Sequence, residues 1–331
     1  MATEMRLAHF SDLHLLSHDG ARWLDLANKR WIGAMNLLSN RSRHYHVDAF
    51  DDMVSDLNAS GVDHVLCTGD VTNLALRQEF EFARGRFDRL ALGPLDITVI
   101  PGNHDAYVAE GIPLFAEFAT CDPGWEWSAA DADAGDEPDD LRWPIVRVRG
   151  ELALIGTSTS RATPWFTAYG RVGAGQLARL KRVLLDPRLD GKVRVVAIHH
   201  PPAGKRAENR IRGLRDHAAF AAVIAETGAD LIVHGHEHRD MTEALPGPSG
   251  AVPVRGIESG TYFNPGNAGH KPEKIERIAR YRIYELGKGT AISETVRVWD
   301  RQRRAFVSGE ASPAKVSGST AGTPGKLRNL T

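Results

Sequence analysis

Short runs of β-branched and apolar residues alternate along the chain with stretches in which apolar residues recur at helical spacing. The first kind of run predicts buried strands, and the second predicts amphipathic helices. Strands that alternate with helices in this way are typical of an α/β fold built on a largely parallel sheet. Strands are predicted at 6–10, 64–68, 97–100, 152–157, 193–199, 231–234, 252–257, 281–284 and 291–299, and helices at 47–57, 74–90, 176–185 and 218–226.

Two stretches depart from this alternation. Residues 121–140 are rich in acidic side chains with Pro, Gly and Ala between them, which predicts a surface insertion. Residues 306–331 are rich in Ser, Gly, Pro and Ala and contain few apolar residues, which predicts a disordered tail. We therefore expect one domain over residues 1–305, with the insertion on its surface.

Composition and charge narrow the class of protein. The 331 residues are 42% hydrophobic and 25% charged, as in ordinary globular proteins. The formal charge of -1 gives the chain as a whole no attraction to nucleic acid or anionic membrane, although local patches remain open. Two cysteines, Cys67 and Cys121, argue against a disulfide scaffold, and we read no signal peptide before the first strand. These observations predict a cytoplasmic location.

Side chains that can bind metals gather in the loops that follow predicted strands. In open α/β sheets, ligands bind beyond the carboxyl ends of the strands, so five such loops are expected to meet at one place. Any one of these residues could be a turn residue or a satisfied core group, but the ordered set of five argues against that. The segments are Asp12-Leu13-His14, Gly69-Asp70, Gly102-Asn103-His104-Asp105, His199-His200-Pro201-Pro202 and His234-Gly235-His236-Glu237-His238.

The ligand types in these loops indicate the kind of metal. Carboxylate and imidazole groups with one amide oxygen favour Mn, Fe or Zn, and the lack of cysteine ligands argues against a structural zinc site. A carboxylate such as Asp70 has two oxygens and can bridge two cations. We therefore expect a binuclear centre whose positive charge attracts a phosphate anion.

The ordered motifs D-x-H, G-D, G-N-H-D, a lone histidine and G-H-x-H resemble those of the calcineurin-like metallophosphoesterase superfamily. The resemblance implies a four-layer α-β-β-α sandwich, in which helices lie outside two packed sheets. It also implies a cofactor of two divalent or mixed-valence metal ions. One ion would be held by Asp12, His14 and His238 and the other by Asn103, His199 and His236, with Asp70 as the bridge.

The same resemblance implies a reaction. A hydroxide that bridges the metals would attack phosphorus in line, and the paired cations would stabilise the attacking and leaving oxygens. His104 would protonate the leaving oxygen, a role that suits histidine because its ordinary pKa lies near neutral pH. Asp105 would hold the His104 ring in place, or would cap the loop instead.

Three residues near the motifs have open interpretations. His200 adjoins the expected ligand His199, and neighbours on a strand face opposite sides, so His200 would orient the ligands, touch substrate or pack in the core. His234 would support a ligand or fill the core. Asn73 would offer its amide to the phosphate or to a base, or would cap the following helix.

Patterns that bear on the substrate are weaker. The segments around Asp70 and His199 are most similar to class III cyclic-nucleotide phosphodiesterases and their broad-specificity bacterial relatives, which implies small phosphodiester substrates. The basic loop after Pro202 contains Arg210 and Arg212. These residues would bind an anionic substrate, or the loop would be a solvated connection without a binding role. No extended basic groove or aromatic platform for nucleic acid is evident in the sequence.

One further segment raises an alternative function. Trp23 and Trp31 lie on a helical stripe flanked by basic residues, a pattern that usually packs on the protein but can lie on an anionic membrane. Membrane contact would favour the related UDP-diacylglucosamine hydrolases, which cleave a lipid pyrophosphate. A non-catalytic metal-binding scaffold is a third alternative, which the complete ligand set disfavours. The oligomeric state is left open by the sequence.

Overall fold

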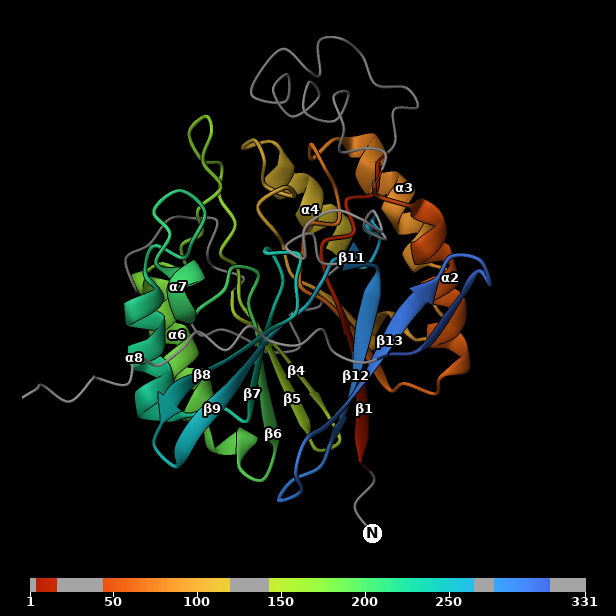
Figure 1. The fold of residues 1–331 in the computed structure, drawn as a ribbon. Helices are drawn as coiled ribbons and strands as arrows, with labels where there is room; N and C mark the ends of the chain where they lie inside the picture. Colours follow the sequence, from red (N-terminus) through yellow and green to blue (C-terminus); the bar gives the residue numbers. More distant parts are fainter. Residues whose placement is uncertain (1–3, 17–43, 120–142, 265–276, 310–331) are drawn as a thin grey trace, which may run out of the picture.

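The computed structural model describes residues 4–16, 44–119, 143–264 and 277–309, and these form two six-stranded sheets and a two-stranded one (Figure 1). The first sheet contains, in spatial order, β14 (Ala305–Gly309), β13 (Ser293–Asp300), β12 (Arg280–Leu286), β1 (Met5–Phe10), β2 (His64–Cys67) and β3 (Ile97–Val99). Strands β1, β2 and β3 are parallel, whereas β12, β13 and β14 continue the sheet in antiparallel pairs.

The second sheet contains, in spatial order, β4 (Ile145–Arg149), β5 (Leu152–Gly156), β6 (Val193–Ala197), β7 (Leu231–His234), β9 (Gly250–Gly256) and β8 (Met241–Gly247). Its four central strands are parallel, and β4 and β8 pair with them in antiparallel sense at the two edges. The short third sheet pairs β10 (Phe263–Asn264) with β11 (Arg277–Ile278).

Helices lie outside both sheets, which gives the four layers that the family resemblance implies (Figure 1). The helices beside the first sheet are α2 (Val47–Ala59), α3 (Arg77–Phe87) and α4 (Gly111–Ala119). Those beside the second sheet are α6 (Ala174–Leu184), α7 (Gly204–Ala207) and α8 (His217–Thr227). Two short 3-10 helices, Pro94–Asp96 and Pro187–Leu189, precede β3 and β6.

Alternate residues of the central strands face different hydrophobic cores. In β6, Val195 and Ala197 pack between the two sheets, whereas Val196 packs against the helices of the second sheet. In β2, Leu66 lies between the sheets and Val65 lies in the core beneath α2 and α3. Because both faces are buried, these strands are largely apolar in the sequence, apart from Arg194 in β6 and His64 at the start of β2.

The prediction of a largely parallel sheet is correct for β1 to β3 in the first sheet and for β5, β6, β7 and β9 in the second. It misses the antiparallel strands β12 to β14 on one side of the first sheet and β4 and β8 at the two edges of the second. An apolar run predicts that a segment is a buried strand, but it does not specify the direction in which that strand runs.

The helix predicted at 74–90 begins later, at Arg77. The carboxylate of Glu79 accepts hydrogen bonds from the backbone nitrogens of Leu74 and Leu76, so these residues form the turn that leads into the helix. Strands β4, β8 and β14 and helix α4 were not predicted, because each is short or exposes residues that break a clean hydrophobic pattern.

Several sequence predictions fall at or beyond the edges of the described chain. The predicted domain boundary after residue 305 divides β14, which pairs with β13 through residue 309, so the sheet continues past that boundary. The predicted insertion at 121–140, residues 310–331 of the predicted tail, and the segment with Trp23 and Trp31 lie outside the described residues. Within the described ranges, no helix has the length and apolar character needed to cross a bilayer.

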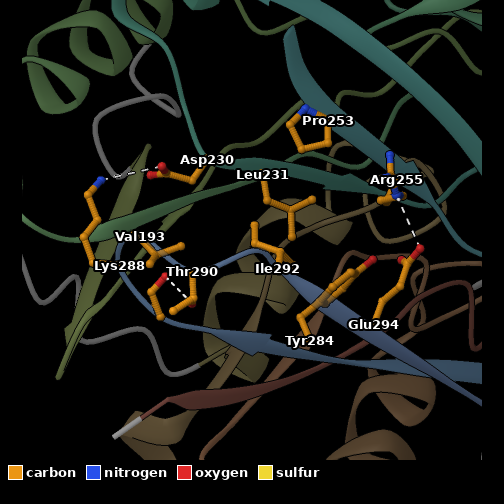
Figure 2. Close-up of a pocket in the computed structure, with 12 residues that line it drawn as sticks. Val193, Asp230, Leu231, Pro253, Arg255, Tyr284, Lys288, Thr290, Ile292 and Glu294 are labelled. Atoms are coloured by element: carbon orange, nitrogen blue, oxygen red, sulfur yellow. Dashed lines mark hydrogen bonds and ion pairs between the residues drawn. The ribbon is translucent and has the colours of Figure 1, made fainter. Parts of the chain in front are cut away.

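A cavity of about 360 Å³ lies between the two sheets, near the end at which the parallel strands begin (Figure 2). Charged side chains in its lining pair with each other: Lys288 with Asp230 at 3.6 Å, and Arg255 with Glu294 at 3.7 Å. The five motif loops follow the opposite ends of the strands, so this cavity is separate from the site described next.

Candidate metal centre

The loops that follow β1 and β2 run side by side and are joined by backbone hydrogen bonds. The backbone nitrogen of Asp12 donates to the carbonyl oxygen of Gly69 at 2.9 Å, and that of His14 donates to the carbonyl oxygen of Asp70 at 2.9 Å. Backbone hydrogen bonds alone therefore fix the position of the first motif loop relative to the second.

The backbone of the expected ligands has an unusual conformation. Asp12, His14, Asp70, His236 and His238 all have positive φ angles, between 45° and 71°. Residues other than glycine rarely adopt this left-handed region, and such strain persists only where the surrounding structure holds it. Only three other non-glycine residues of the described chain share it, so the strain is concentrated where five motif side chains are turned toward one point.

The first group of ligand atoms comes from Asp12, His14, Asp70 and His238, whose candidate atoms all lie within 4.8 Å of one another. Nε2 of His14 lies 3.2 Å from Nε2 of His238, and the latter lies 3.3 Å from Oδ1 of Asp12. Three of these side chains are buried and the fourth is partly buried, so the group is largely shielded from solvent.

The second group adjoins the first through Asp70. Oδ1 of Asn103 lies 3.2 Å from Nε2 of His199 and 2.8 Å from Nδ1 of His236. Oδ2 of Asp70 lies 3.5 Å from Nε2 of His199 and 3.8 Å from Nε2 of His14. One carboxylate oxygen therefore faces histidines of both groups, which is the position that a bridging ligand needs.

Two glycines allow the loops to approach this closely. A Cβ atom on Gly102 would overlap the backbone nitrogen of Asp70, and a Cβ atom on Gly235 would overlap Oγ of Ser11. The latter would also lie 2.6 Å from Oδ2 of Asp12. At both positions a side chain would displace an expected ligand, so only glycine fits.

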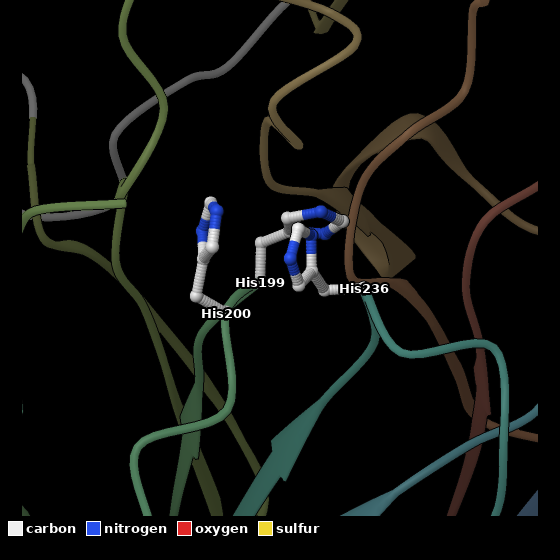
Figure 3. Close-up of side chains that lie close together, drawn as sticks. All are labelled: His199, His200 and His236. Carbon is white, nitrogen blue, oxygen red and sulfur yellow. The ribbon is translucent and has the colours of Figure 1, made fainter. Parts of the chain in front are cut away.

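His200 lies beside the second group but is held by the protein. Figure 3 shows its ring with those of His199 and His236 beyond the ends of β6 and β7. Nε2 of His200 donates to the carbonyl oxygen of Ala168 at 3.0 Å, and Nδ1 accepts from the hydroxyl of Thr159 at 2.7 Å. With both nitrogens engaged, its ring packs 4.2 Å from that of His236, which favours an orienting role.

Of the two roles predicted for Asp105, the hydrogen bonds favour the loop cap over support of the His104 ring. The Asp105 carboxylate accepts from the backbone nitrogens of Val71, Thr72 and Gly102, so it caps the loop. Nδ1 of His104 instead donates to the carbonyl oxygen of Asn73 at 2.7 Å. The backbone nitrogen of His104 also donates to Oδ1 of Asp70 at 2.7 Å, which ties it directly to the carboxylate that is expected to bridge the two ions.

Asn73 does not cap a helix, and its predicted contact with phosphate or base stays a prediction. Its amide nitrogen donates to the carbonyl oxygen of His14 at 2.6 Å, and α3 begins at Arg77 rather than after Asn73.

Arg210 and Arg212 are exposed on the loop between α7 and α8, as expected for residues that meet an anion or solvent. His234 is buried in β7, with Nδ1 3.0 Å from the carbonyl oxygen of Gly235.

The structure adds residues that the sequence did not single out. The hydroxyl of Tyr45 lies 3.2 Å from Nδ1 of His238. The hydroxyls of Ser259 and Thr261 donate to the carbonyl oxygens of Asp12 and Leu13, at 2.6 Å in both cases. None of these residues belongs to a motif loop, and only their position in the fold connects them to the centre.

Replacing Tyr45 with phenylalanine is expected to weaken metal binding about 10–100-fold, as is typical when the partner of a ligating histidine is lost. The Tyr45 hydroxyl accepts from Nδ1 of His238 and so leaves the Nε2 lone pair for a cation. Calorimetric titration of metal-free protein with Mn²⁺ measures the change. Tyr262→Phe removes a hydroxyl from the neighbouring ring and serves as the control. Equal affinities for wild type and Tyr45→Phe would contradict this role.

Burial and neighbouring charges set the protonation of the metal-free centre. Burial lowers the pKa of His236 well below its ordinary value and that of His200 to about 3, so both rings are neutral. Burial also acts on His199, but Asp70 and Asp12 outweigh it and raise its pKa to about 9. Ligation needs a neutral imidazole, so a cation must displace this proton, and metal binding is expected to weaken in acid.

The donor set fits a pair of divalent cations. Imidazole nitrogens and carboxylate or amide oxygens converge at short distances, and a cation between them would be bound by lone pairs that now face each other. Nε2 of His236 is also buried without a hydrogen-bond partner in the described part of the chain, which is costly unless a ligand or water reaches it.

Comparisons with known proteins agree with this geometry. A model of the family described as calcineurin-like phosphoesterase matches residues 5–240, a range that includes all five motif loops. A dimetal phosphatase from Danio rerio matches at 14% identity and a TM-score of 0.56, over 92% of this chain and 98% of its own. A purple acid phosphatase from seeds of yellow lupin (Lupinus luteus) matches at 11% identity and a TM-score of 0.54, over 96% of this chain and 58% of its own. No curated protein matches the chain. At these identities the two structural matches show a shared fold.

Proposed function

The chain belongs to the calcineurin-like phosphoesterase family, and we propose that it is a two-metal hydrolase of small phosphodiesters, cyclic nucleotides included. The observation that carries this proposal is the position of Asp70, whose Oδ2 faces histidines of both ligand groups. The proposed ligands are Asp12, His14 and His238 for one ion, Asn103, His199 and His236 for the other, and Asp70 for both. The choice among Mn, Fe and Zn stays a prediction from the ligand types.

His104 is the proposed general acid. Bound divalent cations would supply positive charge and activate water for attack on phosphorus. The His104 ring lies beside that of His14, with centroids 4.7 Å apart, and it is only partly buried. Because Nδ1 keeps its proton on the Asn73 carbonyl oxygen, the acid form is the doubly protonated ring, and the proton on Nε2 would pass to the leaving oxygen.

Features beside the centre support a diester whose second group is apolar or aromatic. A cavity of about 200 Å³ next to His14 is lined largely by apolar side chains, among them Leu13 and Leu15. Burial is the main cause of the lowered pKa values of His200 and His236, and the positive charge of Arg212 makes a small further contribution. We propose that Arg212, exposed on the loop after Pro202, contacts the non-reacting part of a nucleotide substrate.

Metal-loaded protein is expected to hydrolyse cyclic nucleotides and bis(nitrophenyl) phosphate faster than nitrophenyl phosphate, the matched monoester. Arg212→Ala should raise KM for nucleotide diesters about tenfold, because a charge-assisted contact is worth roughly 1.5–3 kcal/mol, while KM for the nitrophenyl diester stays the same. Steady-state kinetics on this panel measures both effects.

Arg303→Ala removes an exposed arginine from the turn between β13 and β14 and is the matched control. A strong preference for the monoester would contradict the diester proposal. Equal KM values for Arg212→Ala and wild type would mean that the loop is a solvated connection and does not bind substrate.

The apolar cavity beside His14 also favours a second candidate, a UDP-diacylglucosamine-type lipid pyrophosphohydrolase. Detergent-dependent hydrolysis of a lipid-linked pyrophosphate, with little activity on soluble diesters, would distinguish it. A non-catalytic scaffold is disfavoured because all seven proposed ligands and His104 are present. The cytoplasmic location stays a prediction from the sequence.

A further inference from the structure

Two loops beside the metal centre form one continuous surface. Residues 160–171 connect β5 to α6, and residues 204–215 contain α7 and lead to α8; both lie at the end of the molecule where the motif loops gather (Figure 1). Backbone hydrogen bonds join them: Ala168 donates to Ile211 at 2.9 Å, and Gly170 donates to Gly213 at 3.0 Å. The two loops therefore present their exposed side chains together.

The first loop ends in a tight turn with two aromatic residues at its corner. The backbone nitrogen of Thr167 donates to the carbonyl oxygen of Pro164 at 3.2 Å, which leaves Trp165 and Phe166 between them. Trp165 is 55% exposed and Phe166 is 79% exposed, and Ile211 of the second loop is 55% exposed. We call these three residues the apolar tip.

The backbone at this turn is strained. Phe166 has a φ angle of 63°, a conformation that bulky residues rarely adopt and that a turn usually assigns to glycine or asparagine. The strain holds a large ring out in solvent, where it has no packing benefit in the isolated chain. A feature that costs free energy in two ways is expected to have a role outside the fold.

The two loops that carry the apolar tip are rich in basic residues. The two loops together contain seven basic residues and a single acidic one, Glu208. The whole chain has a formal charge of -1, so this surface is a local concentration of positive charge. Some of the cations are engaged within the protein, since Arg206 pairs with Glu237 at 2.9 Å and Arg215 lies over the ring of Tyr169. The basic residues are Arg161, Arg171, Lys205, Arg206, Arg210, Arg212 and Arg215.

We propose that the apolar tip and the basic residues of its two loops dock on an anionic phospholipid membrane. Tryptophan and phenylalanine insert at the boundary between headgroups and acyl chains, and the cations are attracted by anionic headgroups. Exposed aromatic rings with cations also suit single-stranded nucleic acid, but the exposed aliphatic side chain of Ile211 cannot stack on a base and partitions into lipid. The combination favours the membrane.

Docking in this way would place the candidate metal centre at the membrane surface. The carbonyl oxygen of Ala168, in the loop that carries the apolar tip, accepts from Nε2 of His200 at 3.0 Å. The tip and the centre are thus linked through one hydrogen bond. The proposal goes beyond the diesterase function and does not depend on it, because vesicle binding is measured without turnover.

Sedimentation with vesicles tests the proposal on the full metal-loaded chain. The protein should bind vesicles of equal parts phosphatidylcholine and phosphatidylglycerol and should bind phosphatidylcholine alone at least tenfold more weakly. Trp165→Ser with Phe166→Asn should weaken binding roughly tenfold or more, since both inserted rings are lost. Asparagine tolerates a positive φ angle, so this variant should stay folded. Lys205→Gln with Arg171→Gln should weaken binding about fivefold per charge.

Leu185→Ser is the matched control, because Leu185 is 56% exposed at the end of α6, outside the two loops. Its vesicle binding should equal that of wild type. The proposal is overturned if the wild-type chain does not bind the anionic vesicles, or if the Trp165/Phe166 variant binds them as well as Leu185→Ser does. Preferential binding of a single-stranded oligonucleotide, competing with the vesicles through the same residues, would overturn it in favour of nucleic acid.

Discussion

Replacing His104 with alanine is expected to lower turnover of an alkyl phosphodiester by about 10²–10⁴-fold while both metal ions stay bound. The ring contributes no proposed metal ligand, and its contacts include the Asn73 carbonyl oxygen and the neighbouring rings of His14 and Tyr107. Its backbone bond to Asp70 survives the substitution. Steady-state kinetics and elemental analysis of the same preparation measure turnover and metal content.

The size of the loss should depend on the leaving group. A nitrophenolate departs with little protonation, so the His104→Ala effect should shrink on a nitrophenyl diester compared with an alkyl diester. Tyr107→Phe keeps a ring stacked on His104 and should lose little activity on either substrate. Equal losses on both substrates would contradict proton donation and would indicate that His104 binds phosphate in the ground state.

The strands and the convergence of their loops could be predicted because they depend on local patterns. Strands such as β6 and β7 are largely buried on both faces, and their short β-branched apolar runs are typical of such strands. A parallel arrangement then brings the loops after several strands to one end of the sheet, where the structure places Asp12, Asp70 and His236 close together.

Other parts depend on contacts between segments that are distant in the sequence. The sequence could not choose between the two roles predicted for Asp105, because the bond of His104 to Asn73 and the bonds of Asp105 to the loop after β2 join distant segments. Tyr45 lies nearly two hundred residues from His238 and carries no motif. The antiparallel edges formed by β8, β13 and β14 likewise depend on turns and pairing that a strand pattern does not encode.

Replacing Asp70 with asparagine is expected to remove both metal ions and to abolish activity. Oδ2 of Asp70 faces His199 and His14, so the loss of its charge weakens both ligand groups together. Asparagine keeps an oxygen that can accept from the backbone nitrogen of His104, so the loop should stay in place. Asp12→Asn is the matched comparison, because Asp12 belongs to one group and should cost one ion while the other remains.

The metal content of the purified wild-type chain tests the two-metal centre most directly. Elemental analysis, compared with protein concentration, should find nearly two ions of Mn, Fe or Zn for each chain, and activity should rise until the second ion is bound. Asp70→Asn should retain neither ion, and Asp12→Asn should retain one. Saturation of the wild-type chain at one ion with full activity would contradict the account.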